Sequence, residues 1–254
     1  MTKIIMCGCN GHMGQVVSGL CKEDPEVEIV AGIDAHNQTE NDYPVFAGFA
    51  ECTIEADVII DFSHVSMTES LLAYSVEHQT PVVFCTTGLS EEQLKSVEKA
   101  WEKVAILKSA NMSLGINMLY DLLAQAAKIL APAGFDMEIV EKHHNQKLDA
   151  PSGTALALAD AVRDALPDHY DYIYDRSQER KKRAKNEIGI AAVRGGNIVG
   201  EHEVIFAGLD EVITFEHTAY SKSLFGKGAI EAAKFLKGKP AGHYDMRDVV
   251  KAKA

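Results

Sequence analysis

The sequence predicts an α/β protein, with an N-terminal Rossmann-like, doubly wound parallel sheet and a C-terminal α+β domain that contains a mixed sheet. The first observation is that short, continuously apolar segments alternate with helical segments over the first 112 residues. Strands of this kind are typical of parallel sheets that are covered on both faces. The second observation is a change of pattern after that point, where one long amphipathic helix precedes several neighbouring strand segments. Such an order favours a mixed or antiparallel sheet with a crossover helix.

Five strands and the helices between them make up the expected N-terminal sheet. The strands are expected at 3–8, 27–34, 56–63, 81–88 and 104–111. Helices are expected at 13–23, 67–78 and 91–103. Ser90 and Gln93 form the pattern of a capping box, which predicts that the last of these helices begins directly after Ser90.

The C-terminal part is expected to begin with a helix at 114–131 and a strand at 136–144, followed by a helix at 153–166 and strands within 187–208 and 210–221. Gly195, Gly196 and Asn197 are typical of a hairpin turn, so the strands on either side of them are expected to pair. A final helix at 226–238 has an apolar face that is expected to pack on the first domain. The expected domains are therefore 1–112, completed by 223–254, and 113–222.

Charge and composition exclude several classes of protein. The 254 residues carry a formal net charge of −12, which argues against nucleic acid or an anionic membrane as a partner. No segment approaches the about 20 apolar residues of a membrane span, and the first residues do not form a signal peptide, so the cytoplasm is the expected location. The five cysteines form no CxxC pair, and no metal site is expected. A small anionic ligand remains compatible with this composition.

A glycine turn between the first strand and the first helix predicts a dinucleotide site. Gly8 permits a tight turn, Gly11 lets a pyrophosphate approach the backbone, and Gly14 lets the helix pack closely on the strand. The GxxGxxG spacing is weak evidence alone. It is strengthened by Asp34, which ends the second strand where an acidic side chain meets the adenosine ribose.

Asp34 favours NADH, because its charge would repel the 2′-phosphate of NADPH. Ala35 supplies no arginine for that phosphate, whereas His36 leaves NADPH use open. Ligands of open α/β sheets bind at the carboxyl ends of the strands, so the ends of the fourth and fifth strands are expected to join the site. The predicted cofactor-binding residues are Gly8, Cys9, Asn10, Gly11, His12, Met13, Asp34, Cys85, Thr86, Thr87, Ser109, Ala110, Asn111 and Met112.

The segment "EKHHNQKLDAPSGTALALAD", residues 141–160, gathers proton carriers at a bend before a helix. His143 and His144 are neighbours on a strand and point to opposite faces, so they are not expected to share a metal ion. A histidine titrates near neutral pH, and Lys147 can transfer a proton or hold a carboxylate. Either histidine taken singly is also compatible with a hydrogen-bonded core residue.

The start of the helix after this bend predicts an anion site. Ser152 is a candidate N-cap, and the main-chain amides of Gly153 and Thr154 are expected to point into the turn at a helix N-terminus. Capping alone explains Ser152 equally well. The combination with three cationic groups nearby predicts a bound carboxylate or phosphate, and its place after a dinucleotide domain suggests that this anion is reduced.

These residues closely resemble the signature of the dihydrodipicolinate reductase family, and the resemblance continues in "GCNGHMG", "CTTG", "SANMS", "VRGGNIVGEHEVIF" and "DMRDVV". It implies reduction of 4-hydroxy-tetrahydrodipicolinate, or dihydrodipicolinate, to tetrahydrodipicolinate with NADH or NADPH, in diaminopimelate and lysine biosynthesis. It also implies that His143 and Lys147 are catalytic and that His144, Gly153 and Thr154 bind the substrate. The family is usually homotetrameric through the sheet of its substrate-binding C-terminal domain, here 113–222.

The chain departs from the family pattern at several positions. Ala35 and His64 stand where arginine is frequent, Cys85 where glycine is common, and Lys222 where arginine is common. The first two departures would weaken a 2′-phosphate site. Two other functions remain open at this stage: another two-domain dehydrogenase, acting on an amino-acid semialdehyde or a sugar, and a non-catalytic nucleotide sensor.

A basic segment, residues 175–187, lies between the helix expected at 153–166 and the strands expected from residue 187. It contains six lysine and arginine side chains among thirteen residues. We expect a solvated, mobile loop, with an anion-attracting lid as the alternative.

Overall fold

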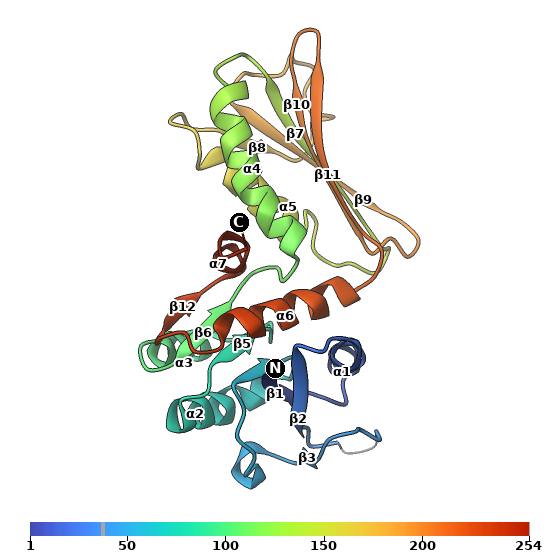
Figure 1. Ribbon diagram of the computed structural model, residues 1–254. Coiled ribbons are helices and arrows are strands. Elements are labelled where there is room, and N and C mark those ends of the chain that lie inside the picture. The colour runs from blue at the N-terminus through green and yellow to red at the C-terminus, as the bar shows by residue number, and fades with distance from the viewer. Residues whose placement is uncertain (37–38, 254) are drawn as a thin grey trace. The chain divides into compact units, whose positions relative to one another are not determined.

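The computed structural model describes residues 1–36 and 39–253. The chain folds into two compact units (Figure 1). Unit 1 consists of Met1–Leu114 and Ser223–Ala254, and unit 2 consists of Gly115–Lys222. Over the described ranges, none of the helices is both long and apolar enough to cross a membrane.

Unit 1 contains a seven-stranded parallel sheet in the order β12-β6-β5-β4-β1-β2-β3. This confirms the doubly wound sheet that the alternation of segments predicts. The strands are β1 (Thr2–Cys7), β2 (Val27–Ile33), β3 (Val45–Phe46), β4 (Val58–Asp61), β5 (Val82–Phe84), β6 (Ala105–Lys108) and β12 (Gly242–Tyr244). The helices are α1 (His12–Glu23), α2 (Thr68–His78), α3 (Glu91–Trp101), α6 (Ser223–Leu236) and α7 (Met246–Lys251), with short 3₁₀ turns η1 (Phe49–Glu51) and η2 (Val65–Met67). The predicted capping box of Ser90 and Gln93 starts α3.

Both faces of this sheet are buried, which explains why its strands are continuously apolar. On β1, Ile4 and Met6 belong to a core that α1, α6 and α7 cover, whereas Ile5 and Cys7 belong to a core under α2 and α3. The helix expected to return to the first domain does so as α6, and Lys234 on it forms ion pairs with Asp24 and Glu26 beside the start of β2.

Unit 2 contains a five-stranded mixed sheet in the order β11-β10-β7-β9-β8. The strands are β7 (Asp136–His143), β8 (Asp171–Ile173), β9 (Glu187–Arg194), β10 (Gly200–Ala207) and β11 (Val212–Ala219), and the helices are α4 (Leu114–Leu130) and α5 (Gly153–Arg163). β7 and β9 are parallel, and the chain between them includes α5. The predicted mixed sheet with a crossover helix is therefore confirmed.

The hairpin predicted at Gly195, Gly196 and Asn197 is wrong. β7 lies between β9 and β10, parallel to the first and antiparallel to the second, so the two expected partners are not neighbours. The turn passes over the end of β7, where Gly195 N–H donates to the carbonyl of His143 and Asn145 N–H donates to the carbonyl of Gly196. A local turn pattern cannot reveal that a strand from earlier in the chain inserts between its two flanks.

The two faces of this sheet differ. Met137, Ile139, Glu141 and His143 alternate along β7 on the face that α4 and α5 cover, which we call the covered face. The residues between them, including Lys142, lie on the opposite face, which we call the open face. Lys142 pairs there with Glu201 and Glu203 of β10.

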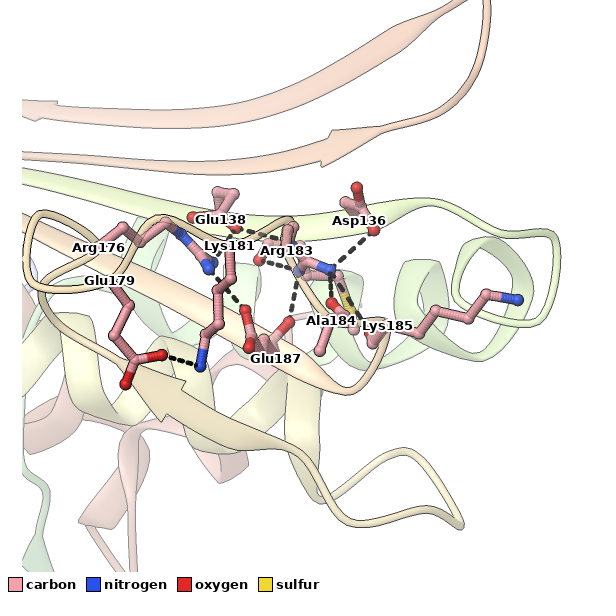
Figure 2. A network of polar contacts seen from close by, with 10 residues as sticks. Asp136, Glu138, Arg176, Glu179, Lys181, Arg183, Ala184, Lys185 and Glu187 are labelled. Carbon is pink, nitrogen blue, oxygen red and sulfur yellow. Dashed lines mark hydrogen bonds and ion pairs between the residues drawn. The ribbon is translucent and has the colours of Figure 1, made fainter.

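The basic segment of residues 175–187 makes its ion pairs with acidic residues of the same unit (Figure 2). Arg183 donates to Asp136 at 2.8 Å and to Glu138 at 2.8 Å. Arg176 pairs with Glu138 at 2.8 Å and with Glu187 at 2.5 Å. The two arginines therefore neutralise carboxylates beside β7 and β9 instead of presenting charge to a ligand, which disfavours the alternative of an anion-attracting lid.

Candidate functional site

The glycine turn of unit 1 requires glycine at two of its positions. Gly8 has φ +79°, and a Cβ added to it would lie 2.6 Å from the carbonyl oxygen of Phe62. A Cβ on Gly14 would lie 2.1 Å from the carbonyl oxygen of Gly8. Any side chain at these positions would therefore force the turn, the strand end or the helix start to move.

The start of α1 offers main-chain donors to an anion. Gly11 is its N-cap and has no side chain with which to satisfy the first helical amides. Those amides and the helix dipole suit a pyrophosphate group, so the residues present fit a dinucleotide.

Asp34 lies beside this turn at the end of β2. Its Oδ2 accepts a hydrogen bond from the main chain of Asn10 at 3.0 Å, and its Oδ1 accepts one from the main chain of His36 at 3.0 Å. The Asn10 side chain also donates to the carbonyl of His36. The structure thus brings the glycine turn together with the acid predicted to meet the ribose, and a carboxylate retains further lone pairs for ribose hydroxyls.

The other predicted cofactor-binding residues follow β5 and β6. Because β1, β2, β5 and β6 are parallel members of one sheet, Cys85–Thr87 and Ser109–Met112 lie at the same edge as the glycine turn. The Thr86 hydroxyl donates to the carbonyl of Ser63 at 3.2 Å, which joins two loops of this edge. Cys9 and Met112 have buried side chains, so they can offer a ligand only their main chain. Burial raises the pKa of the Cys9 thiol to about 11, which keeps it protonated.

Asp61, which the sequence analysis did not single out, shapes the same edge. Its buried carboxylate accepts hydrogen bonds from the main chain of Ser63 at 3.0 Å and from its hydroxyl at 2.5 Å. Burial raises the pKa of Asp61, although the hydrogen bonds from Ser63 and Thr86 oppose that shift. Its position at the end of a buried strand, in "DFS", is the signal that could have found it.

In unit 2, a buried cluster forms around Glu141. The side chain of Glu141 is completely buried and accepts a hydrogen bond from Nδ1 of His143 at 2.6 Å. Arg194 donates to both carboxylate oxygens, at 2.8 and 2.7 Å, and also to the carbonyl of Asp149 at 2.7 Å. The main chain of Ser152 donates to Glu141 at 2.9 Å. Burial alone would raise the pKa of Glu141, but the hydrogen bonds from Arg194, His143 and Ser152 lower it below its ordinary value, so the group is a carboxylate.

Ser152 connects this cluster to the start of α5. Its hydroxyl caps the helix by accepting from the main chain of Ala155 at 3.1 Å, which confirms the predicted N-cap. The same hydroxyl is 3.1 Å from Nε2 of His202, whose ring meets that of His143 edge-on with centroids 5.1 Å apart. Burial, and next the charge of His143, lower the pKa of His202 to about 4, so His202 is neutral near pH 7.

Lys147 and the first amide of α5 meet at one carboxylate. Lys147 Nζ lies 2.8 Å from Oδ1 of Asp149. The pKa of Asp149 is lowered mainly by this bond from Lys147, with a smaller contribution from the N–H of Gly153. His144 lies just beyond the end of β7, half-buried, and its carbonyl accepts from the main chain of Lys147 at 3.2 Å. Thr154 is half-buried in the first turn of α5.

The bend therefore brings His143 and Ser152 to the carboxylate of Glu141, and Lys147 to that of Asp149. Glu141 and Arg194 are functional residues that were not predicted from the sequence. Glu141 stands two positions before His143 on a strand, which places both on one face, and this spacing is the signal that could have found it. Arg194 is 53 residues from Glu141, so nothing in the local sequence connects the two.

A Rossmann-like sheet with a glycine turn, joined in one chain to a mixed-sheet unit with a polar bend, defines a nucleotide-dependent oxidoreductase. Two family models match the chain: the N-terminal part of dihydrodipicolinate reductase over residues 2–112 and its C-terminal part over residues 115–250. The chain belongs to the dihydrodipicolinate reductase family, and its Rossmann-like unit implies use of NAD(P)H.

Individual relatives agree with this assignment. The 4-hydroxy-tetrahydrodipicolinate reductase of Caldanaerobacter subterraneus subsp. tengcongensis is 55% identical over 99% of this chain and 99% of its own length. The protein of the same name from Clostridium tetani is 49% identical over 97% of this chain and 96% of its own length. Among solved structures, the dipicolinate-bound dihydrodipicolinate reductase from Paenisporosarcina sp. TG-14 has the same fold, with a TM-score of 0.81 and 23% identity over 98% of this chain and 99% of that one.

Proposed function

We propose that the chain reduces 4-hydroxy-tetrahydrodipicolinate (dihydrodipicolinate) to tetrahydrodipicolinate with NAD(P)H, as a step of diaminopimelate and lysine biosynthesis. The names of its relatives supply the substrate, and the two family models together match most of the chain.

One observation in unit 2 carries this proposal. Lys147 Nζ lies 2.8 Å from the carboxylate of Asp149 just before α5 begins at Gly153, and the N–H of Gly153 makes a small contribution to lowering the pKa of Asp149. The same donors, at a helix N-terminus, suit a carboxylate of a small dicarboxylic ligand equally well. We propose that such a ligand displaces Asp149 and that His144, Gly153 and Thr154 bind it.

We propose that Gly8–Met13, Asp34, Cys85–Thr87 and Ser109–Met112 hold the nucleotide. When bound, the reduced nicotinamide supplies a hydride to the conjugated C=N/C=C system of the substrate. The negative charge that then develops elsewhere in that system is neutralised by a proton from His143 or Lys147. General acid catalysis of this type typically contributes about 10²–10⁴-fold in rate.

A spectrophotometric assay that follows NADH absorbance with freshly generated substrate tests the proposal. We expect substrate-dependent loss of NADH. Tight NADH binding without such loss would favour a nucleotide sensor, and turnover of an amino-acid semialdehyde or a sugar instead would favour another dehydrogenase. Either result would contradict the proposed function.

We propose that NADH is preferred over NADPH. Asp34 is a carboxylate held at the ribose edge by Asn10 and His36 main-chain donors, and its charge opposes a 2′-phosphate. His64 lies in the loop after β4 and caps η2 through its ring, accepting from the main chain of Ser66. The ratio of kcat/KM for NADH to that for NADPH measures the preference, and a ratio below one would contradict it.

We propose that the chain forms a cytoplasmic homotetramer through unit 2. The open face of its sheet exposes apolar side chains, including Val193 and Val212, which are 45% and 62% exposed. Apolar side chains on an uncovered sheet face are typical of surfaces that bind another chain. Light scattering on the purified protein should give the mass of four chains, and the mass of a single chain would contradict the assembly.

A further inference from the structure

We propose that Glu141 is a positioning residue for His143: its buried carboxylate fixes the imidazole ring and its tautomer, so that only Nε2 can exchange a proton with a ligand. This inference rests on the proposed function, which places His143 at the reacting group. It concerns a residue that does not touch the substrate and acts through another side chain.

The contacts of Glu141 determine which nitrogen of His143 carries the fixed proton. Glu141 accepts from Arg194 at both oxygens and from the main chain of Ser152 at one of them. An ionised carboxylate can only accept hydrogen bonds. The 2.6 Å contact with Nδ1 of His143 therefore requires a proton on Nδ1, in the neutral ring as well as in the charged one.

The other ring nitrogen of His143, Nε2, lies beside the start of β10. A Cβ added to Gly200, the first residue of that strand, would lie 3.1 Å from Nε2. Any larger residue would crowd the nitrogen that is free of Glu141. The neutral ring thus presents a bare Nε2, and His143 can give a proton only from its doubly protonated form.

The surroundings of the ring oppose a change of this arrangement. The imidazole is mostly buried, with 9% of His143 exposed, and His202 meets it edge-on. Arg194 holds both Glu141 and the carbonyl of Asp149, so the carboxylate is anchored to the bend as well as to β7. A carboxylate fixed in this way orients an imidazole without itself changing its protonation.

A purely structural role for Glu141 makes a different prediction. A buried ion pair between Glu141 and Arg194 would then affect folding, and its loss would weaken every function of the unit. A positioning role predicts an effect on turnover that disappears when His143 is already absent.

The test is a double-mutant cycle on the full-length protein with NADH and the proposed substrate. Glu141→Gln should lower kcat at least about tenfold, with KM changed by less than about threefold and with NADH affinity unchanged. In a His143→Gln background, the same substitution should change kcat by less than about twofold. Equal losses in both backgrounds would overturn the proposal.

Asp164→Asn is the matched control. Asp164 is also a carboxylate of unit 2 and pairs with Arg163 at 2.9 Å, but it lies at the end of α5, outside the bend and the open face. We expect kcat within about twofold of the unsubstituted chain. A loss as large as that of Glu141→Gln would show that any charge removed from unit 2 has the same effect, which would also overturn the proposal.

Nuclear magnetic resonance of ring-¹⁵N-labelled histidine keeps the proposal testable if Glu141→Gln does not fold. The signals of His143 are assigned by their loss in His143→Gln. We expect the neutral ring to carry its proton on Nδ1, and a neutral ring protonated on Nε2 would refute the inference. This measurement does not require turnover, so it tests the role of Glu141 by itself. Failure of the proposed function is detected separately, by the NADH assay on the unsubstituted chain.

Discussion

The glycine turn of unit 1 and the bend of unit 2, the two proposed anion sites, present their hydrogen-bond donors by opposite means. In the turn, the donors are main-chain amides, and their geometry requires glycine at positions 8 and 14, where a Cβ would clash with main-chain atoms. In the bend, most donors are side chains, and their geometry depends on carboxylates that hold them, Glu141 for His143 and Asp149 for Lys147.

This difference determines which kind of substitution should disrupt each site. A main-chain site tolerates many changes of side-chain chemistry but fails when atoms are added, because nothing can move out of the way. A side-chain site tolerates some change of shape but fails when a charge or a proton carrier is removed.

Lys147→Ala should remove a charge from the bend and leave the turn intact. We expect kcat to fall by about 10²–10⁴-fold, because Lys147 is proposed to donate the proton or to hold a substrate carboxylate. NADH affinity, measured by fluorescence titration, should stay within about twofold, since unit 1 contains all the proposed nucleotide contacts. Lys181→Ala is the control, because Lys181 is an exposed lysine of the same unit that pairs with Glu179 at 2.7 Å in the basic segment. Unchanged turnover in Lys147→Ala would remove Lys147 from the mechanism.

Gly14→Ala should break the turn by addition of a single methyl group. Its Cβ would lie 2.1 Å from the carbonyl oxygen of Gly8, so the start of α1 must move away from β1. We expect NADH affinity to fall about 100-fold, as a strain of roughly 1–3 kcal/mol displaces the phosphate-binding amides. Gly19→Ala on the same helix is the control, because within the described chain a Cβ there meets only open space. Equal NADH affinity in both variants would contradict a phosphate site at this turn.

The cluster of the bend should make the chain less stable in acid. The folded-state pKa of His202 is about 4, below its ordinary 6.5, so the unfolded chain takes up this proton first as the pH falls. The contribution of neutral His202 is therefore complete above pH 6.5 and is lost between 6.5 and 4. At pH 5 the loss is roughly 2 kcal/mol in the free energy of unfolding.

Urea denaturation at pH 7 and pH 5 measures this effect. His202→Gln should lose less stability over that interval than the unsubstituted chain, because no proton is taken up at this position. His169→Gln, at a histidine whose side chain is 84% exposed, should follow the unsubstituted chain. The same acid loss in His202→Gln would show that other groups cause it. Protonation of Glu141 also lowers the free energy of unfolding, but at lower pH. Its folded-state pKa is lowered, so this loss occurs as the pH falls from the ordinary carboxyl value through the folded-state value.

Asp149→Asn gives the smallest expected effect. The carboxylate of Asp149 forms an ion pair with Lys147. A partly exposed ion pair of this kind typically contributes about 0–1 kcal/mol of interaction free energy. Removing its charge should tighten binding of pyridine-2,6-dicarboxylate by up to about fivefold in calorimetry. Asp168→Asn, at an exposed aspartate of the same unit, is the control. Weaker binding in Asp149→Asn would show that Asp149 orients Lys147 and does not compete with the ligand.

Much of the fold could be predicted because its signals are local. The continuous apolar runs of β1, β4 and β5 predict strands buried on both faces, and the capping residues Ser90 and Ser152 mark the starts of α3 and α5. The predicted hairpin at Gly195 and Gly196 was wrong because the turn pattern describes only the local backbone. The place beside β9 that β10 was expected to fill is taken by β7, which pairs Met137 with Ile188.

The sequence by itself determined the residue types of the two sites and their order along the chain. Gly8, Gly14 and Asp34 flank predicted strands, and His143, Lys147 and Ser152 stand close together before a helix, because main-chain geometry and helix capping act over a few residues. Only the tertiary structure decided which groups these residues face. Arg194 on β9 binds Glu141 on β7, and His202 on β10 contacts Ser152 at the start of α5; both pairs are distant in the sequence. The proton on Nδ1 of His143 and the neutral state of His202 follow from this burial and pairing, which no short segment of the sequence contains.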